Sequence, residues 1–350
     1  MRYQSVCVEA VTYVLPPDVV SSEAIEERLR PVYERLGLPF GRLEMMTGIR
    51  ERRFFPPGTL PSQVSAESGR RALEAAGLDR RYIGALIHGS VCRDQLEPAT
   101  ATAVHHALEL PEDCHVFDVS NACLGLLNGM TIVADWIESG RIRAGLVVGT
   151  EDGRALLETT IQTLLNAPDL TRQSIKPAFA SLTIGAGSAA ILLCDAKLSR
   201  TGRRLIGGVT LADTSHHRLC SGGTDATAGH QQGPLMETRS EEMLHAGVAL
   251  AERTWQKFLA RLHWAPTDVR KVFTHQVGRA HRNLLLQRLG LRPEMDFPTV
   301  EFLGNTGAVA LPMTMAMGLE RGHVRPGERF ALLGIGSGLN CMMLGLQEGG

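Results

Sequence analysis

The sequence lacks an apolar run long enough to cross a membrane, and it lacks a strong charge of either sign. No stretch of the 350 residues reaches the roughly 18 consecutive apolar residues that a spanning helix needs. The formal net charge is −1, so electrostatics gives no case for nucleic acid or an anionic membrane as the main partner. The N-terminal segment also lacks the pattern of a secretory signal. We therefore expect a cytoplasmic protein without an integral membrane segment.

Cysteine is present without any of the spacings that signal a paired site. The chain has seven cysteines, an odd number, and none forms a C-x-x-C pair. This gives no support for a zinc knuckle or a dithiol redox site, and we expect neither a metal nor a cofactor. In a cytoplasmic chain most cysteines are small buried hydrophobes, and we assign that role to all of them except Cys123.

What the sequence does contain is a regular alternation of short apolar runs with segments of helical periodicity. The predicted strands include 85–91, 144–150 and 188–195, and the predicted helices include 65–78, 99–110 and 241–262. Such alternation predicts an α/β layered fold with buried strands. Residues 117–130 and 300–316 both read as a strand, a small-residue turn and a helix. This echo predicts two similar halves, 1–198 and 199–350.

The first of these turns, "FDVSNACLGLLNGM", places Cys123 among small residues where a strand passes into a helix. We expect its sulfur to lie at or inside the first turn of that helix. Backbone N–H groups and the positive end of the helix dipole favour a thiolate there. The same N–H groups could hold the oxyanion of a carbonyl under attack.

Three other stretches could carry chemistry. His275 ends a strand-like run in "FTHQVGRAH", at the edge where α/β sheets bind ligands. Asn305 lies in the turn of "EFLGNTGAVALP", where an amide could point into a site or simply tolerate the turn geometry. Residues 333–341, "LGIGSGLNC", are rich in glycine but lack the spacing of a dinucleotide loop.

Together these stretches resemble the thiolase-superfamily condensing enzymes over nearly the whole chain, and most closely the ketoacyl-ACP synthase III branch. The stretches that match are "MTGIRERRF", similar to the T-G-I-x-x-R signature of that branch, "GLVVGTE" after the cysteine, and "LGNTGAVALP". The resemblance implies a five-layer αβαβα fold of two α/β halves. It also implies a catalytic triad of Cys123 and His275 with Asn305, the cysteine in the first half and the other two in the second.

Three departures from the synthase III pattern look like OleA-type enzymes, which join two acyl-CoA molecules head to head. The histidine loop reads H-Q-V-G, the C-terminal loop reads G-I-G-S-G-L-N, and "IGAGSA" lacks the usual aspartate. Glu97, in "RDQLEPAT", stands where the synthase III branch usually has an aromatic residue. In OleA-type enzymes this glutamate is the base proposed to remove an α-proton, reaching the site of the neighbouring subunit. On local pattern alone a glutamate at a helix N-terminus is the preferred interpretation, and the family resemblance favours the catalytic role.

The resemblance thus implies a non-decarboxylative Claisen condensation of two acyl-CoA thioesters through an S-acyl-cysteine, giving a 2-alkyl-3-oxo acid for an olefin or β-lactone pathway. Coenzyme A thioesters are substrates, not cofactors. The Ile335 turn would supply an oxyanion N–H and Ser337 would orient the site. A homodimer is expected, and a downstream reductase or β-lactone synthetase is a possible partner. Candidates for the CoA phosphates are Arg50 and Arg279, with Arg52, Arg53 and Arg282 behind them.

Other functions remain open from the sequence. A decarboxylative ketoacyl synthase III would share the triad but use a malonyl donor. An acyltransferase would pass the Cys123 acyl group to an alcohol or amine and would need no α-proton base. A non-enzyme alternative is an inactive partner subunit of a heterodimeric condensing enzyme. We also expect the segment 152–180 to border the acyl pocket.

Overall fold

The structure is a computed structural model that describes residues 1–222 and 236–350. Most strands belong to one mixed sheet: β1 (Val6–Val14), β4 (Ile83–His88), β5 (His115–Asp118), β6 (Ala144–Asp152), β7 (Ala186–Asp195), β8 (Arg204–Ala212), β11 (Val269–Thr274), β12 (Arg329–Gly336) and β13 (Asn340–Gln347). Among the described residues their order is β11-β12-β13-β8-β1-β7-β6-β4-β5. Two small ribbons pair β2 (Asp18–Ser21) with β3 (Glu51–Phe54) and β9 (Cys220–Gly222) with β10 (Met236–Thr238).

The sheet repeats one strand pattern on each side of its centre. On one side β4 and β6 are parallel, while β6–β7 and β7–β1 are antiparallel. On the other side β11 and β12 are parallel, while β12–β13 and β13–β8 are antiparallel. The two sets meet where Cys7 of β1 pairs with Arg204 of β8. The two halves of the chain thus repeat one strand topology, and the expected boundary at 198 falls in the connection between β7 and β8.

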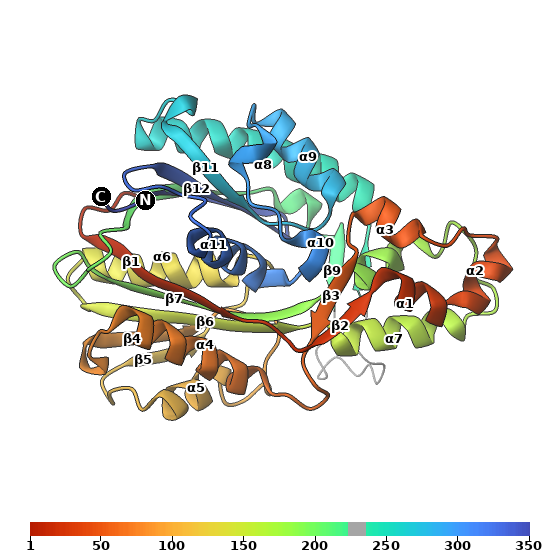
Figure 1. Ribbon diagram of the computed structural model, residues 1–350, viewed down its shortest axis with the longest axis horizontal. Helices are drawn as coiled ribbons and strands as arrows, with labels where there is room; N and C mark the ends of the chain where they lie inside the picture. Colours follow the sequence, from red (N-terminus) through yellow and green to blue (C-terminus); the bar gives the residue numbers. More distant parts are fainter. Residues whose placement is uncertain (223–235) are drawn as a thin grey trace.

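Helices cover both outer faces of this sheet and fill the space between its two halves (Figure 1). The helices of the layers are α4 (Pro61–Ala76), α5 (Thr100–Leu108), α6 (Gly125–Glu138), α8 (Ser240–Leu262), α9 (Arg279–Arg288), α10 (Val300–Leu303) and α11 (Ala310–Glu320). Helices α4 and α5 pack on the N-terminal half, and α8 and α9 pack on the C-terminal half. Because α6 and α11 lie between the two halves, the arrangement is the expected five-layer αβαβα fold.

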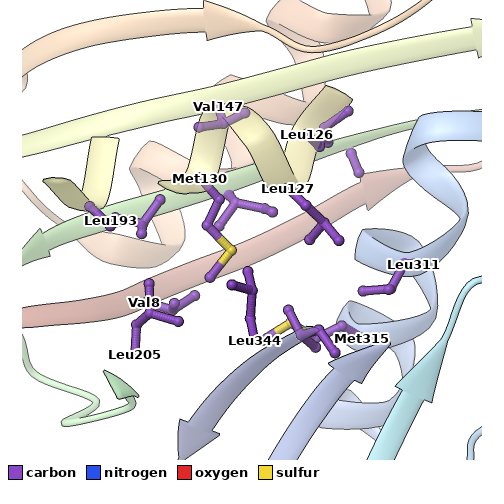
Figure 2. Packing of buried hydrophobic residues seen from close by; sticks show 14 of the residues in the cluster. Val8, Leu126, Leu127, Met130, Val147, Leu193, Leu205, Leu311, Met315 and Leu344 are labelled. Carbon is purple, nitrogen blue, oxygen red and sulfur yellow. The ribbon is translucent and has the colours of Figure 1, made fainter. Parts of the chain in front are cut away.

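The central core consists of buried apolar side chains that pack on both sides of α6 and α11. Leu127 and Met130 of α6 meet Met315 of α11 together with side chains from strands of both halves, among them Val8 and Leu344 (Figure 2). All of these side chains are buried. Each fully buried side chain of this kind contributes roughly 1.5–3 kcal/mol relative to an exposed one. This packing fixes α6 and α11, and therefore the turns that precede them, relative to each other.

A separate cluster of buried residues lies beside the five layers. It joins α1 (Ser22–Arg28), α2 (Arg30–Leu36), α3 (Arg42–Thr47) and α7 (Arg154–Leu165) with the 3-10 segment Lys176–Thr183. These short helices pack around Tyr33 and Leu43, both fully buried. The cluster forms an additional body beside the end of the sheet where β6 runs into α7 (Figure 1).

Two local predictions are wrong. The helix expected from residue 65 begins earlier, because α4 starts at Pro61, whose fixed φ suits the first helical position. Residues expected to form a strand at Val300–Leu303 form the one-turn helix α10, and an isolated bridge to β11 lies earlier, between Asp296 and Val272. Within residues 1–222 and 236–350, no helix combines the length and apolar character needed to span a bilayer.

Candidate active site

Cys123, His275 and Asn305 line one cavity of about 910 Å³, although they are far apart in the sequence. Cys123 lies in the turn before α6, Asn305 in the turn before α11, and His275 directly after β11. The turns before α6 and α11 occupy matching positions in the two halves. The repeated topology thus brings the three side chains to one end of the sheet, as the sequence predicts.

Cys123 sits in a strained turn just outside its helix. Ala122 has a φ of +43°, a left-handed conformation that costs a non-glycine residue of order 1 kcal/mol. Helix α6 begins at Gly125, so Cys123 lies at the N-terminal end of the helix, two residues before it, and not inside its first turn. The small neighbours have a packing reason, since a Cβ on Gly125 would lie 2.2 Å from the carbonyl oxygen of Gly89.

Glycines in β12 let that strand approach the nucleophile turn. A Cβ on Gly334 would lie 2.6 Å from a methyl carbon of Leu124, and one on Gly336 would lie 3.1 Å from the Cγ of the same residue. This close approach brings the backbone of Ser337 to the Cys123 sulfur, where it forms a hydrogen bond. The glycine-rich stretch 333–341 therefore serves the cysteine turn. Ile335 also lines the cavity, and the oxyanion roles remain predictions.

The free thiol is protonated, contrary to the thiolate expected from the helix N-terminus. Burial, and secondarily the negative charge of Glu151 and the nearby Cys220, raises the pKa of Cys123 to about 12. Hydrogen bonds from the backbone of Cys123 and Ser337 act in the opposite direction but do not outweigh burial.

This raised pKa predicts the pH dependence of Cys123 alkylation. Because the thiolate is the nucleophile and the folded pKa is near 12, the rate with iodoacetamide should rise about tenfold per pH unit from pH 7 to 9 without a plateau. Peptide mapping by mass spectrometry isolates the signal of Cys123, and the same peptide in denaturant should level off near the ordinary thiol pKa. A plateau below pH 8 in the folded protein would show that the thiolate is preformed.

His275 is a neutral imidazole with both ring nitrogens free for a ligand. Its side chain is buried, and neither nitrogen has a hydrogen-bond partner among the described residues. Burial, and secondarily the neighbouring His281, lowers the pKa of His275 to about 3. Its place is fixed by its backbone N–H, which donates to Leu333, and by Gln276, whose side-chain oxygen accepts from the backbone N–H of Thr299. A neutral ring in this position can donate one N–H to a carbonyl oxygen.

Asn305 is held by backbone contacts on both sides. Its backbone N–H donates to the carbonyl oxygen of Thr183, and its carbonyl oxygen accepts from the backbone N–H of Gly185. These two hydrogen bonds attach the turn to the segment that leads into β7. The side-chain Oδ1 accepts from the N–H of Gly307 at 3.0 Å. This leaves Nδ2 as the donor available to the cavity, beside His275.

Glu97 stands apart from this cavity in the single chain. It lies in the exposed loop between β4 and α5, and it is not among the residues that line the cavity. Helix α5 begins only at Thr100, so Glu97 is not a residue of the helix N-terminus. Its predicted contribution to a neighbouring subunit stays a prediction.

The arginine candidates for CoA phosphates separate into two groups. Arg279 is exposed and begins α9, between cavity residues Gly278 and Ala280, and Arg50 is exposed but pairs with Glu301. For these two the prediction stands untested. The further candidates Arg52 and Arg282 do not fit.

The guanidinium groups of Arg52 and Arg282 both bind other groups of the protein. Arg52 is fully buried and donates to the Ser22 hydroxyl and the Leu182 carbonyl oxygen. Arg282 forms an ion pair of 2.6 Å with the buried carboxylate of Asp296. Neither guanidinium can reach a phosphate at the surface. Arg53, half-buried, donates to the carbonyl oxygen of Pro16.

Several cavity residues escaped the sequence reasoning. They are Cys92, Glu151, Cys220 and His281. Glu151 had a signal that could have been used, because it ends the apolar run of β6 at the same sheet edge as His275. The segment expected to border the acyl pocket does line the cavity, through Asp152, Gly153, Ala155, Leu156, Phe179 and Ala180.

Comparisons with known proteins agree with this geometry. Residues 46–160 match the model of the thiolase N-terminal domain, and residues 259–346 match that of the 3-oxoacyl-[acyl-carrier-protein] synthase III C terminus. The chain is 41% identical to the acyl-CoA:acyl-CoA alkyltransferase of Shewanella oneidensis, across 99% of this chain and 100% of the relative. The chain belongs to the acyl-CoA:acyl-CoA alkyltransferase family. The member from Xanthomonas campestris is 35% identical across 98% of each chain.

Solved structures of OleA share this fold along the whole chain. Xanthomonas campestris OleA superposes with a TM-score of 0.93 at 34% identity, covering 99% of this chain and 98% of that one. Another OleA structure, a cysteine-to-serine variant with bound lauric acid and lauroyl-CoA, gives a TM-score of 0.92 with 99% of both chains covered. Further OleA structures carry substitutions of a glutamate or a histidine. The beta-ketoacyl synthase III of Rhizorhabdus wittichii is more distant, at 30% identity across 83% of this chain and 85% of the relative.

Proposed function

We propose that this protein condenses two fatty acyl-CoA thioesters head to head, without decarboxylation, to a 2-alkyl-3-oxo acid. The observation that carries the proposal is the single cavity that holds Cys123, His275 and Asn305 in a chain related to acyl-CoA:acyl-CoA alkyltransferases along its full length. The volume of about 910 Å³ is at the upper end of the roughly 300–1,000 Å³ typical of small-molecule sites.

In the first half-reaction the Cys123 sulfur attacks the carbonyl carbon of one acyl-CoA. Its proton leaves with the departing CoA sulfur, which is why a thiol with a pKa near 12 can still be acylated without a preformed thiolate. The backbone N–H groups of Cys123 and Ser337, which already face the sulfur, stabilise the oxyanion. The product is an S-acyl-cysteine and free CoA, as in a ping-pong mechanism.

In the second half-reaction another acyl-CoA binds with its thioester oxygen on the N–H of His275 and the Nδ2 of Asn305. Glu97 removes an α-proton, and the resulting enolate is held by these two donors. The enolate carbon attacks the acyl-cysteine carbonyl, the bond to Cys123 breaks, and the sulfur recovers a proton from Glu97. Water then hydrolyses the 2-alkyl-3-oxoacyl-CoA, so two acyl-CoA molecules and one water give one keto acid and two CoA molecules.

The acyl chains are placed against the wall that α7 and the Lys176–Thr183 segment provide. Ala155, Leu156, Phe179 and Ala180 line the cavity there, and apolar side chains of this kind bind alkyl chains by excluding water. The structure of OleA with lauric acid and lauroyl-CoA supports a fatty acyl chain as the occupant. The keto acid product calls for a reaction that reduces its 3-oxo group, which makes a reductase followed by a β-lactone synthetase a reasonable pair of successors.

The homodimer forms through the edge of the sheet that ends in β5. Strand β5 is paired only to β4 within the described residues, so its outer edge can accept another strand. Beside it the loop of Glu97 exposes Val91 (52%) and Leu96 (58%), two large apolar side chains that a partner subunit would cover. In such a dimer Glu97 enters the partner's cavity.

Lauroyl-CoA as the sole substrate tests the function. We expect a Cys123 acyl adduct by mass spectrometry, release of two CoA per turnover, and a doubled-chain keto acid or its decarboxylated ketone. The Shewanella oneidensis relative assayed in parallel is the control. Condensation only with a malonyl donor and CO₂ release would instead identify a decarboxylative synthase. An adduct that reacts only with an added alcohol or amine would identify an acyltransferase, and no adduct would leave a non-catalytic partner subunit.

A further inference from the structure

Glu151 is a buried carboxylate of the active cavity that the mechanism above does not use. It lies near the end of β6, only 6% exposed, and lines the cavity with Cys123, His275 and Asn305. Among the described residues no lysine or arginine forms an ion pair with it. A buried charge without a cationic partner is costly, so its hydrogen bonds must account for its presence.

Those hydrogen bonds come from two separate loops. Oε1 accepts from the backbone N–H of Val91 at 2.9 Å and of Ala308 at 3.4 Å, and Oε2 accepts from that of Cys92 at 3.2 Å. All three partners can only donate. The two carboxylate oxygens therefore satisfy them together, whereas an amide would turn its N–H₂ group toward one of them. Burial raises the pKa of Glu151, and these three N–H groups act in the opposite direction.

The first loop is the one that carries Glu97. Val91 and Cys92 follow β4 directly, and the Cys92 sulfur accepts from the backbone N–H of Asp152, so this part is tied to the end of β6. A few residues on, the Asp94 side chain accepts from Ser62. The carboxylate of Glu151 thus anchors the loop where it leaves the sheet, five residues before Glu97.

The second loop is the turn that orients Asn305. Gly307 donates to the Asn305 Oδ1, and a Cβ on Gly307 would lie 3.2 Å from the Glu151 Cγ. The carboxylate therefore packs directly against Gly307 and bonds the next residue, Ala308. Any shift of Glu151 moves the peptide that sets which end of the Asn305 amide faces the cavity.

We propose that Glu151 is a positioning residue for condensation, which ties the Glu97 loop to the Asn305 turn so that the proton acceptor and the enolate-binding amide keep a fixed separation. This inference rests on the proposed function. Glu151 does not serve the acylation step, because its charge raises the pKa of the Cys123 thiol and so opposes formation of the nucleophile.

The test separates the two half-reactions in Glu151→Gln. The new amide keeps the shape but turns an N–H₂ toward a backbone donor, so one loop is released. With lauroyl-CoA we expect condensation to fall about tenfold or more, since a group misplaced by about 1 Å costs up to 10²-fold in rate. The single-turnover rate of Cys123 acylation should not fall below that of the parent. Glu112→Gln, in an exposed loop, is the matched control and should leave both rates unchanged.

A second readout reports on the charge itself. Removing the carboxylate should move the alkylation profile of Cys123 to lower pH, because a raising influence on its pKa is lost. The other titratable groups lining the cavity remain: Cys92, Arg93, Asp152, Cys220, His275 and His281. Glu151→Asp keeps the charge but is one methylene shorter, so it should leave the alkylation profile in place and still condense slowly. A merely structural defect would lower condensation in both variants without shifting the alkylation profile of Cys123 in Glu151→Gln alone.

Gly307→Ala approaches the same contact from the other loop. Its Cβ, in a left-handed backbone conformation with φ of +55°, presses on the Glu151 side chain. We expect the same selective loss of condensation. Parent-like condensation in Glu151→Gln, or equal losses in acylation and condensation, would overturn the proposal. Failure of the parent itself to condense lauroyl-CoA would refute the proposed function instead, which keeps the two conclusions distinct.

Discussion

Substitution of Cys123 by alanine is expected to abolish the S-acyl enzyme and to lower condensation by about 10³-fold or more, because loss of a nucleophile removes the covalent route altogether. The fold should survive the change. Cys123 occupies a turn outside α6 and faces the cavity, so the substitution removes one sulfur that the core does not need. Intact-mass measurement after exposure to lauroyl-CoA, together with CoA release, gives both quantities.

Cys114→Ala provides the matched control for the loss of a thiol. Cys114 is buried in the cluster under α4 and α5, away from the cavity. We expect it to lower stability modestly and leave the adduct at Cys123 intact. An undiminished rate of chain joining in Cys123→Ala would leave the proposed mechanism without its first step.

Glu97→Gln is expected to separate the half-reactions more sharply than any other change. Cys123 should acylate at close to the parent rate, while condensation should fall about 10²- to 10⁴-fold, the usual contribution of a general base. The physical reason is that an unactivated acyl-CoA must lose a C–H proton. The neutral His275 cannot serve well as its acceptor, because burial lowers the pKa of His275 to about 3.

A heterodimer of Cys123→Ala and Glu97→Gln chains tests whether the glutamate acts across the interface. Two different affinity tags allow this dimer to be purified from the homodimers. If Glu97 enters the partner's cavity, one of the two sites is complete and the heterodimer should show about half of the parent activity. If each site used its own Glu97, no site would be complete and the heterodimer would be as inactive as the two homodimers.

The local sequence predicted the parts of this site but not their environment. Small residues in "SNACLG" and "LGNTGA" indicate turns, and apolar periodicity indicates the strands and helices on either side of them. His275 follows from its place at the end of a strand. The cysteine in a sharp turn, the histidine and the asparagine could therefore be named from the sequence, together with the family resemblance, and the structure brings all three to one cavity.

Sequence reasoning failed where long-range contacts decide the outcome. The thiol of Cys123 was expected to be acidic, but burial and the charge of Glu151, which arrives from another strand, raise its pKa to about 12. Glu151 itself was missed because its three partners are backbone N–H groups of residues 60, 59 and 157 positions away in the chain. Backbone donors leave no mark in a sequence.

The sequence by itself determined the alternation of strands and helices, the two turns that repeat between the halves, and the residue types that chemistry requires there. Periodicity, turn residues and capping act over a few neighbouring positions, so they can be read along the chain. Only the tertiary structure decided the solvent exposure and protonation state of each group, and which loops the carboxylate of Glu151 holds together. Desolvation and hydrogen bonding of a buried group depend on every segment packed around it, and those segments come together only when the two halves close over α6 and α11.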